Sequence, residues 1–385
     1  MKNNQTKNII FFRINTQYEN LGDLIINKTL LENLRKYGNL VINIKGVPEW
    51  FSQELHIKDD YKVCKYKIEF SILLLLFAFK YLFQANSKVY FVLTPGHHSD
   101  DTSNTPRLLH EFRLIANFLL LKIMGVRICR FGASIGPFSK VGQIREKWQS
   151  KLMYFYSVRD TKAKDYANQI EINKVELFPD LAWNMQVPYE SNTLLKLDDQ
   201  EYVIFSFREY YKDFDITNLY RNMLLTTLDE IVKTVCSKWQ KKLVISYQVE
   251  FDYDLCRDIS NKYKDECELI FIDKKIDSQS WYNLYSRSYM IFSNRLHVLI
   301  FAMVCGSIPV AVVDSLTHDK ITGVFSDAGL MRLLINISNR NNGVEVLNEI
   351  SADSNRIKKD IALYIEHQKQ TIDTIFSHVM NGQSQ

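Results

Sequence analysis

Two successive sets of short apolar runs alternate with longer helical segments, and this alternation constrains the fold most. Short continuous apolar runs between helices are typical of parallel strands covered on both faces. In the first half, strands are predicted at 8–14, 40–44, 89–93, 126–131, 156–159 and 174–178, and helices at 23–37, 68–83, 108–124 and 144–155. In the second half, strands are predicted at 202–208, 242–247, 269–272, 289–292 and 308–313, and helices at 219–239, 256–263, 280–287, from 297, and 358–376.

The polar stretch 190–200 has no clear periodicity and is interpreted as a linker. A chain of 385 residues also exceeds the roughly 250 to 300 residues at which a single core stops growing. We therefore predict two Rossmann-like α/β domains, over 1–188 and 200–345, that face a cleft. A last helix over 355–380 is expected to pack back on the N-terminal domain. Ligands are expected at the carboxyl ends of the strands.

Composition excludes several classes of protein. The formal net charge of +4, from 48 basic and 44 acidic residues, gives no reason to expect a nucleic-acid partner. Six scattered cysteines without a C-x-x-C pair favour neither a zinc ribbon nor a disulfide framework. This cysteine usage favours a reducing, cytoplasmic location, and no secretory signal is evident.

The segment Ser71–Phe83 is strongly apolar, but it is shorter than the about 20 residues that cross a bilayer, and Lys80 interrupts it. A buried helix is the favoured interpretation. The alternative is a helix that lies in the membrane interface, preceded by Lys62, Lys65 and Lys67.

Arg295 and His297 stand between two apolar runs, where a strand ends and a helix begins. Helix N-termini bind anions through free N–H groups, arginine adds fixed charge, and histidine carries a proton that moves near neutral pH. Arg208 closes another apolar strand, where a buried cation needs an anionic partner. We therefore expect an anion site in the C-terminal domain.

Other strand ends in the N-terminal half carry polar or small residues. Asp23 follows Gly22 at a predicted helix start, where helix capping and substrate contact are equally compatible with its position. The stretch Gly132–Phe138, which includes Ser134, would let a ligand approach the backbone. Arg159 is favoured as part of an internal salt bridge over a ligand contact.

A metal site is a further possibility for the loop Thr94–Asp100, which contains His97, His98 and Asp100. No third ligand has suitable spacing, so no metal is expected there.

Five segments in order, over about residues 15–325, resemble the motifs of the polysaccharide pyruvyl transferases. They are Asn20–Ile25, Gly132–Phe138, Ser157–Asp160, Phe178–Asp180, and Asn294–His297 followed by Gly306–Pro309. The resemblance implies a two-domain fold like that of B-type glycosyltransferases. It also implies transfer of the pyruvyl group of phosphoenolpyruvate, a co-substrate, to a sugar as a ketal, with phosphate release and without a metal or other cofactor.

The resemblance gives candidate residues their roles. His297 is the expected general acid, and Arg208 and Arg295 the expected anion ligands. Further expected substrate contacts are Leu296, Lys320, Asn20, Gly22, Asp23, Gly132, Ser134, Arg159 and Asp180.

The sequence departs from the family pattern at Ala133–Ser134 and at Pro95–His98, in the half that the resemblance assigns to the acceptor. The acceptor sugar is therefore left open. A lipid-linked sugar at the inner face of the cytoplasmic membrane is expected, with a peripheral membrane contact.

Two alternatives remain. One is a B-type glycosyltransferase that uses a nucleotide sugar, with Glu250 or Asp252 as the acid for the ribose. The other is a non-catalytic polysaccharide assembly protein, against which the trio Arg208, Arg295 and His297 argues.

Overall fold

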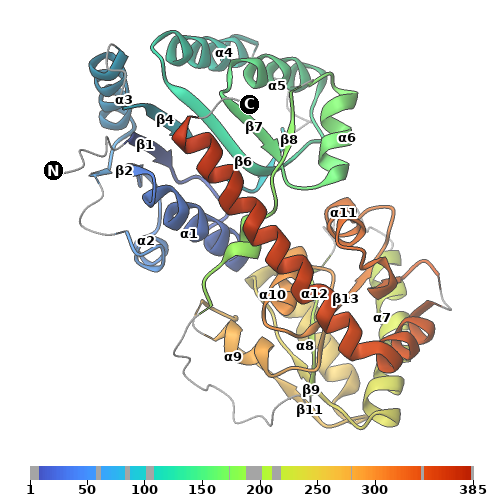
Figure 1. Ribbon diagram of the computed structural model, residues 1–385. Helices are drawn as coiled ribbons and strands as arrows, with labels where there is room; N and C mark the ends of the chain where they lie inside the picture. Colours follow the sequence, from blue (N-terminus) through green and yellow to red (C-terminus); the bar gives the residue numbers. More distant parts are fainter. Residues whose placement is uncertain are drawn as a thin grey trace. The chain divides into compact units, whose positions relative to one another are not determined.

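The computed structural model divides the chain into two compact units, each built on one parallel sheet (Figure 1). It describes residues 8–57, 62–82, 87–100, 108–172, 174–187, 202–209, 218–278, 280–339 and 342–382. Unit 1 comprises Met1–Tyr18, Asp23–Met185 and Gln370–Gln385, and unit 2 comprises Glu19–Gly22 and Gln186–Lys369. The predicted linker at 190–200 lies outside the described residues.

The sheet of unit 1 has the strand order β3-β2-β1-β4-β6-β7-β8, and β5 pairs with β6. Its strands are β1 (Asn8–Arg13), β2 (Gly38–Asn43), β3 (Lys62–Cys64), β4 (Val89–Val92), β5 (His97–His98), β6 (Arg127–Ile135), β7 (Phe155–Val158) and β8 (Glu176–Leu177). Its helices are α1 (Leu21–Arg35), α2 (Glu49–Glu54), α3 (Lys67–Leu82), α4 (Leu108–Ile123), α5 (Lys140–Leu152), α6 (Thr161–Gln169) and the short 3-10 turn η1 (Leu181–Asn184). Leu21 and Gly22, at the start of α1, belong to unit 2.

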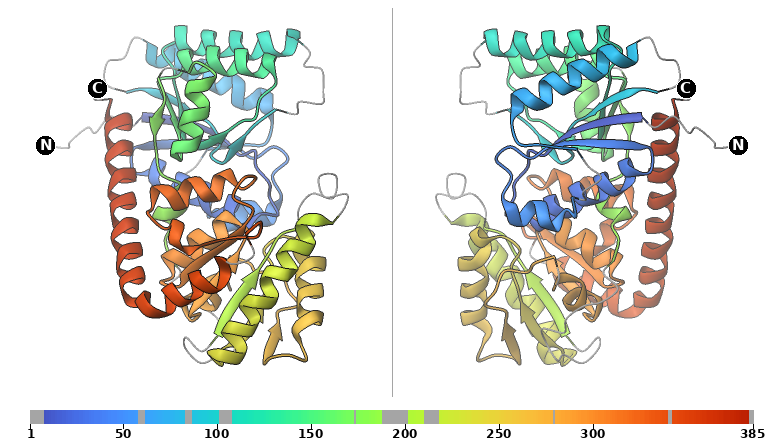
Figure 2. Two further views of the ribbon diagram at one scale, coloured as in Figure 1. Left: turned by 90° about the vertical axis from the view of Figure 1, so that its right-hand side faces the viewer. Right: turned by 90° about the vertical axis from the view of Figure 1, so that its left-hand side faces the viewer.

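The two faces of this sheet have separate cores. Alternate strand residues such as Phe11 pack with Phe70 and Leu74 of α3 and with Phe118 of α4. The opposite face is covered by α1 and by the last turns of the long helix α12 (Asn342–Asn381) (Figure 2). There Phe376 stacks on Phe131, with ring centroids 4.5 Å apart. The hydroxyl of Tyr90 donates to the carbonyl of Met380 over 3.0 Å.

Unit 2 contains a six-stranded sheet in the order β11-β10-β9-β12-β13-β14, in which every pairing is parallel. Its strands are β9 (Tyr202–Ser206), β10 (Lys242–Ile245), β11 (Leu269–Phe271), β12 (Met290–Ser293), β13 (Ile308–Val313) and β14 (Leu334–Asn336). Its helices are α7 (Leu219–Val232) with a π-helical extension η2 (Lys233–Lys238), the turn η3 (Glu250–Asp252), α8 (Tyr253–Tyr263), α9 (Trp281–Ser286), α10 (Leu296–Val304), α11 (Asp319–Asp327), the turn η4 (Met331–Leu333) and the first part of α12.

The interpretation of the Ser71–Phe83 segment as a buried helix is wrong for one of its sides. Phe70, Leu74 and Ala78 of α3 are buried, but Leu76 and Phe79 are 60% and 66% exposed. The helix is apolar all round, so burying one stripe on the sheet leaves another in solvent. Phe83 itself lies outside the described residues.

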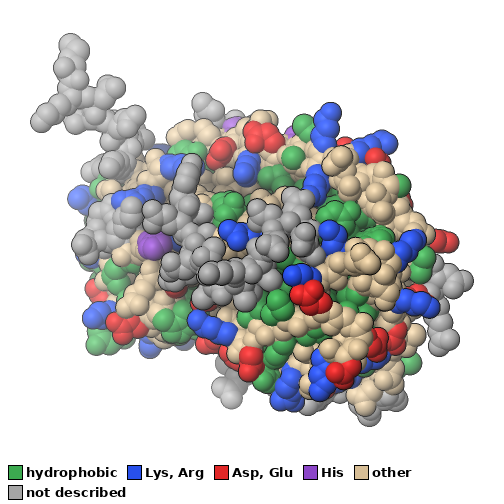
Figure 3. Space-filling model, turned by 90° about the horizontal axis from the view of Figure 1, so that it is seen from below, with side chains coloured by type: hydrophobic (Ala, Val, Ile, Leu, Met, Phe, Trp, Pro, Cys, Tyr) green, Lys and Arg blue, Asp and Glu red, His purple; other side chains and the backbone are tan. Residues whose placement is uncertain are grey.

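Charge is distributed as the composition predicts on the face drawn in Figure 3, where basic and acidic side chains are interspersed. Among the helices that the structure describes, none is both long and apolar enough to cross a membrane.

Candidate active site

Polar side chains gather at the carboxyl ends of the central strands of unit 2. β9 leads to Arg208, β12 leads to Arg295 and His297, and β13 leads to His318. β9 and β12 are neighbours, with Ser206 opposite Ser293 in the register. Because all strands are parallel, their carboxyl ends meet at one edge of the sheet, where open α/β sheets bind ligands.

Asn294 fixes the backbone of Arg208. Its side-chain oxygen accepts from the N–H of Arg208 over 2.7 Å, and its amide nitrogen donates to the carbonyl of Arg208 over 3.0 Å. The same amide nitrogen donates to the hydroxyl of Tyr220 over 2.9 Å. Arg208 is thereby held at the edge of the sheet by a side chain 86 residues away.

The guanidinium of Arg208 contains a donor without an acceptor. Its Nε atom is buried, and within the described part of the chain no group accepts a hydrogen bond from it. Glu209, the acid next to it in sequence, pairs instead with Arg221 over 3.0 Å. A buried donor without an acceptor costs free energy, and charge increases that cost. Arg208 is therefore the side chain best suited to receive an anion here.

Arg295, an expected anion ligand, has a partner within the protein. Its Nε and Nη2 atoms donate to the two carboxylate oxygens of Asp252, the second over 2.6 Å. Burial raises the pKa of Asp252, and Arg295 and Arg208 act in the opposite direction. The sequence missed this pair because 43 residues separate its members. Asp252 is thus engaged by arginine, which weakens its assignment to a nucleotide ribose.

His297 occupies the first turn of α10, between Leu296 and the buried remainder of the helix. Leu296 and His297 are both half-buried, and the imidazole stacks on Phe301 with ring centroids 6.1 Å apart. Gly22 lies directly against the imidazole, so a β-carbon at position 22 would overlap it. The side-chain oxygen of Asn20 accepts from the N–H of Gly22 over 2.9 Å. Asn20 and Gly22 therefore belong to the surroundings of His297 in unit 2.

His318 is a site residue that sequence reasoning missed. It is buried, and its ring stacks on that of Tyr220 with centroids 5.7 Å apart. Burial lowers the pKa of His318, and the nearby cation of Arg208 lowers it further. Both effects favour the neutral form of the imidazole. Lys320, which the resemblance assigned to the substrate, is exposed in the first turn of α11.

Most of the remaining candidates lie in unit 1, where they have structural partners. The carboxylate of Asp23 accepts from the hydroxyl of Thr16 over 2.8 Å and from the N–H of Gln17 over 3.1 Å, so it ties down the loop after β1. The salt bridge predicted within Ser157–Asp160 is present, with Arg159 Nε 3.5 Å from Asp160, and Arg159 also donates to Asp180 over 3.0 Å in a buried ion pair that was not predicted.

Gly132 and Ser134 lie on β6. Gly132 has a φ of +59° and lies against Phe178 and Pro179, so its small size is required by packing within the unit. Ser134 is buried, and within the described residues its hydroxyl makes no hydrogen bond. Among the unit 1 candidates, the Ser134 hydroxyl and the Nε atom of Arg159 are therefore the buried polar groups that make no hydrogen bond within the described residues.

In the loop that contains His97, His98 and Asp100, the last two residues also have partners within the protein. His98 Nε2 lies 3.1 Å from Glu146 Oε2, and Asp100 accepts from the N–H of Ser139 over 2.7 Å. Glu146 also pairs with Arg130, and the hydroxyl of Tyr156 donates to it over 2.9 Å. Within the described ranges, no three side chains of the metal-ligating types form a cluster.

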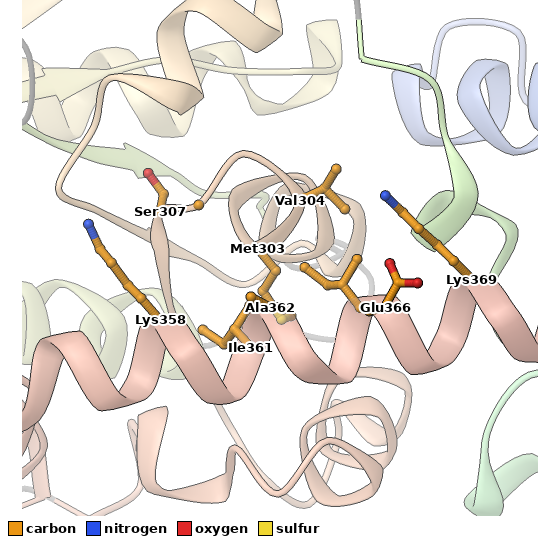
Figure 4. Close-up of a pocket in the computed structure, with 10 residues that line it drawn as sticks. Met303, Val304, Ser307, Lys358, Ile361, Ala362, Glu366 and Lys369 are labelled. Carbon is orange, nitrogen blue, oxygen red and sulfur yellow. The ribbon is translucent and has the colours of Figure 1, made fainter.

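A cavity of about 250 Å³ lies at the opposite end of α10, against α12 (Figure 4). It is lined by Met303 and Ser307 on one side and by Lys358, Ile361 and Glu366 on the other. None of the candidate residues lines it, so it is distinct from the site at the start of α10.

Comparison with known structures shows the fold. A putative UDP-N-acetylglucosamine 2-epimerase from Listeria monocytogenes superposes with a TM-score of 0.59 at 13% identity, over 97% of this chain and 96% of that one. A glycosyltransferase from Rickettsia africae superposes with a TM-score of 0.58 at 10% identity, over 98% of this chain and all of the other. The expected α/β class, with two parallel sheets as in B-type glycosyltransferases, is confirmed.

Comparison of sequences identifies the family. No curated protein matches the chain. Residues 20–315, however, match the family profile described as polysaccharide pyruvyl transferase, and this range contains Arg208, Asp252, Arg295 and His297. The chain therefore belongs to the polysaccharide pyruvyl transferase family and is a transferase of polysaccharide pyruvylation.

Proposed function

We propose that this enzyme transfers the pyruvyl group of phosphoenolpyruvate to a sugar of a lipid-linked polysaccharide precursor as a ketal and releases phosphate. The observation that carries the proposal is the buried Arg208 Nε, which lacks an acceptor within the described residues, at the sheet edge that also bears His297. Phosphoenolpyruvate carries a phosphate and a carboxylate, and arginine binds both groups through directed N–H donors.

The donor site would use two kinds of positive group. Arg208 would bind one anionic group directly. The first turn of α10 adds backbone N–H groups that have no partner within the helix, together with the positive end of its dipole. Arg295 would contribute through Nη1, because Asp252 takes its Nε and Nη2. Lys320 would add charge from the exposed start of α11.

The chemistry requires one proton at carbon and gives one to phosphate. In the proposed reaction, His297 protonates the methylene carbon of phosphoenolpyruvate, and a sugar hydroxyl attacks the cationic centre at C2. Phosphate then leaves with its bonding electron pair, and a second hydroxyl of the same sugar closes the ketal. The two hydroxyls release two protons, of which one restores His297 and the other leaves with phosphate. General acid catalysis of this kind contributes about 100- to 10,000-fold in rate.

The acceptor would be held by unit 1. Ser134 remains the candidate for polar contact there, because its hydroxyl makes no hydrogen bond within the described residues, whereas Arg159 donates through Nη1 to Asp180. Phosphoenolpyruvate is a cytoplasmic metabolite, so we place the reaction at the inner face of the cytoplasmic membrane. No metal or other cofactor is part of the proposed reaction.

The test supplies purified protein with phosphoenolpyruvate and a pool of lipid-linked sugars, and follows phosphate release and the mass of the lipid product. Phosphate release together with a gain of one pyruvyl ketal is expected. If no acceptor supports phosphate release and a nucleotide sugar is consumed instead, the proposal is wrong.

The role of His297 is tested by His297→Asn, with the exposed helical residue His367→Asn as the matched control. Turnover should fall by about 100-fold or more for His297→Asn, as expected for loss of a general acid, with little change in phosphoenolpyruvate binding. Loss of binding instead would reassign His297 from proton donor to ligand contact.

A further inference from the structure

Two helices of unit 1 carry exposed apolar stripes with the same spacing. On α3 the stripe consists of Ile68, Ile72, Leu75, Leu76 and Phe79, and on α4 it consists of Phe112, Ala116, Leu119, Leu120 and Ile123. Each stripe follows the pattern i, i+4, i+7, i+8, i+11, which places its members on one side of a helix. These ten residues are called the α3–α4 apolar surface below.

The solvent exposure of these side chains is large. Ile68, Phe112 and Ile123 are 74%, 65% and 69% exposed, and both helices bury a different stripe on the sheet. Single exposed apolar residues are ordinary, but a continuous set on a folded protein marks a binding surface.

The two stripes belong to one face of the unit. α3 and α4 cover the same side of the sheet, because Phe70 and Leu74 of α3 share a core cluster with Phe118 and Leu121 of α4. The views in Figure 2 place the two helices on this side. Leu82, at the end of α3, also lies close to Gly125, just after α4. The apolar surface therefore extends over two neighbouring helices.

The basic charge near these helices favours anionic lipid over a protein as the binding partner of this surface. The basic side chains on these two helices and on the segment 62–66 before α3 are Lys62, Lys65, Lys67, Lys80, Arg113 and Lys122. Of the acids on the two helices, Glu111 is neutralised by Arg145 over 2.8 Å, which leaves Glu69. Lysine is depleted in protein interfaces but is favoured beside anionic lipid, where its stem covers apolar surface and its ammonium reaches the headgroups.

The neighbouring helix α5 adds an aromatic anchor. Trp148 is 52% exposed, and the ammonium of Lys151 lies 5.0 Å from the centre of its ring. Tryptophan is enriched at the boundary between headgroups and acyl chains. α3 and α4 have 16 residues each, which suits helices that lie in the interface.

We propose that the α3–α4 apolar surface inserts into the interface of a bilayer that contains anionic lipid. It would hold unit 1, the proposed acceptor side, where lipid-linked sugars are found. Only this link to the acceptor rests on the proposed function, since the exposed apolar side chains and the basic charge beside them do not depend on the reaction.

The test is co-sedimentation of the full chain with vesicles of phosphatidylcholine alone or with about a third phosphatidylglycerol, an anionic fraction sufficient to attract a basic surface. We expect binding to the anionic vesicles that weakens at high salt. Leu76→Glu and Leu120→Glu should each lower the bound fraction at least about fivefold, because a carboxylate opposes both insertion and anionic headgroups. Leu363→Glu, on the exposed side of α12, should bind like the wild type.

Several outcomes would overturn the proposal. They are no sedimentation of the wild type with anionic vesicles, equal binding by Leu76→Glu, or an equal loss for Leu363→Glu. A dimer in light scattering that dissociates on Leu76→Glu would assign the surface to a second copy of the chain. The melting shift with phosphoenolpyruvate, measured on the same preparations, reports the proposed function separately. Vesicle binding without that shift would refute the donor assignment and leave the membrane surface intact.

Discussion

Loss of the guanidinium at position 208 or 295 is expected to have different consequences, because the two arginines have different surroundings. Arg208 has a buried Nε without an acceptor in the described part of the chain, whereas Arg295 forms a bidentate ion pair with Asp252. We predict that Arg208→Met weakens phosphoenolpyruvate binding with little effect on folding. Arg295→Met is predicted to destabilise the fold, because it leaves the carboxylate of Asp252 buried and unpaired.

The magnitudes follow from burial. The side chain of Asp252 is 1% exposed and that of Arg295 is 15% exposed, so solvent screens the pair little. Removal of one partner from a buried ion pair costs about 3 to 5 kcal/mol, or roughly 10 °C in melting temperature for a domain of this size. A hydrogen bond to a charged group contributes about 2 kcal/mol, so Arg208→Met should weaken binding about 30-fold. Removal of an unsatisfied donor should offset the lost attraction between Arg208 and Asp252, so the stability should change by less than about 1 kcal/mol.

The assay is thermal unfolding with and without phosphoenolpyruvate, supported by calorimetric titration. A ligand that binds only the folded state raises the melting temperature, so Arg208→Met should lose most of that rise. The control is Arg356→Met, which removes an arginine that is 69% exposed from the same unit and should alter neither quantity. A wild-type melting shift in Arg208→Met, or an unchanged melting temperature in Arg295→Met, would refute the reasoning.

Three further predictions concern residues around the two sheets. Glu146→Gln should destabilise the folded chain by about 3 to 5 kcal/mol, because it leaves the buried cation of Arg130 without its partner. In the same thermal scan, the surface substitution Glu171→Gln should leave the melting temperature unchanged. In the folded chain the pKa of His318 lies below its ordinary value of 6.5. As the pH falls through 6.5, the unfolded chain therefore binds more protons than the folded chain, and the folded state loses stability. His318→Phe should flatten the fall of melting temperature between about pH 7 and pH 5, and an unchanged slope would assign that fall to other groups. Gly132→Ala should lower the melting temperature more than Gly46→Ala. Both glycines have a positive φ, but only at position 132 would a β-carbon meet backbone, 3.0 Å from the carbonyl oxygen of Pro179. Equal losses in melting temperature would contradict this explanation.

The sequence indicated where strands and helices occur, because the spacing of apolar residues is a local property of the chain. The strand Met290–Ser293 and the helix from Leu296 lie within one or two residues of their predicted bounds. The π-helical extension Lys233–Lys238 after α7 was missed, and it forms the last part of the helix that was predicted over 219–239. The exposed side of α3 was also missed, because a helix that is apolar all round does not reveal which side a sheet will cover.

The sequence by itself placed Arg208, Arg295 and His297 at strand ends, since each follows an apolar run. Only the tertiary structure decided which of these groups are engaged. Parallel pairing of β9, β10, β12 and β13 brings together side chains that are distant in the chain, so Asp252 reaches Arg295 and His318 reaches Tyr220 over a separation of 98 residues. Ion pairs and hydrogen bonds depend on distances of a few ångströms, which sheet topology sets and local sequence does not.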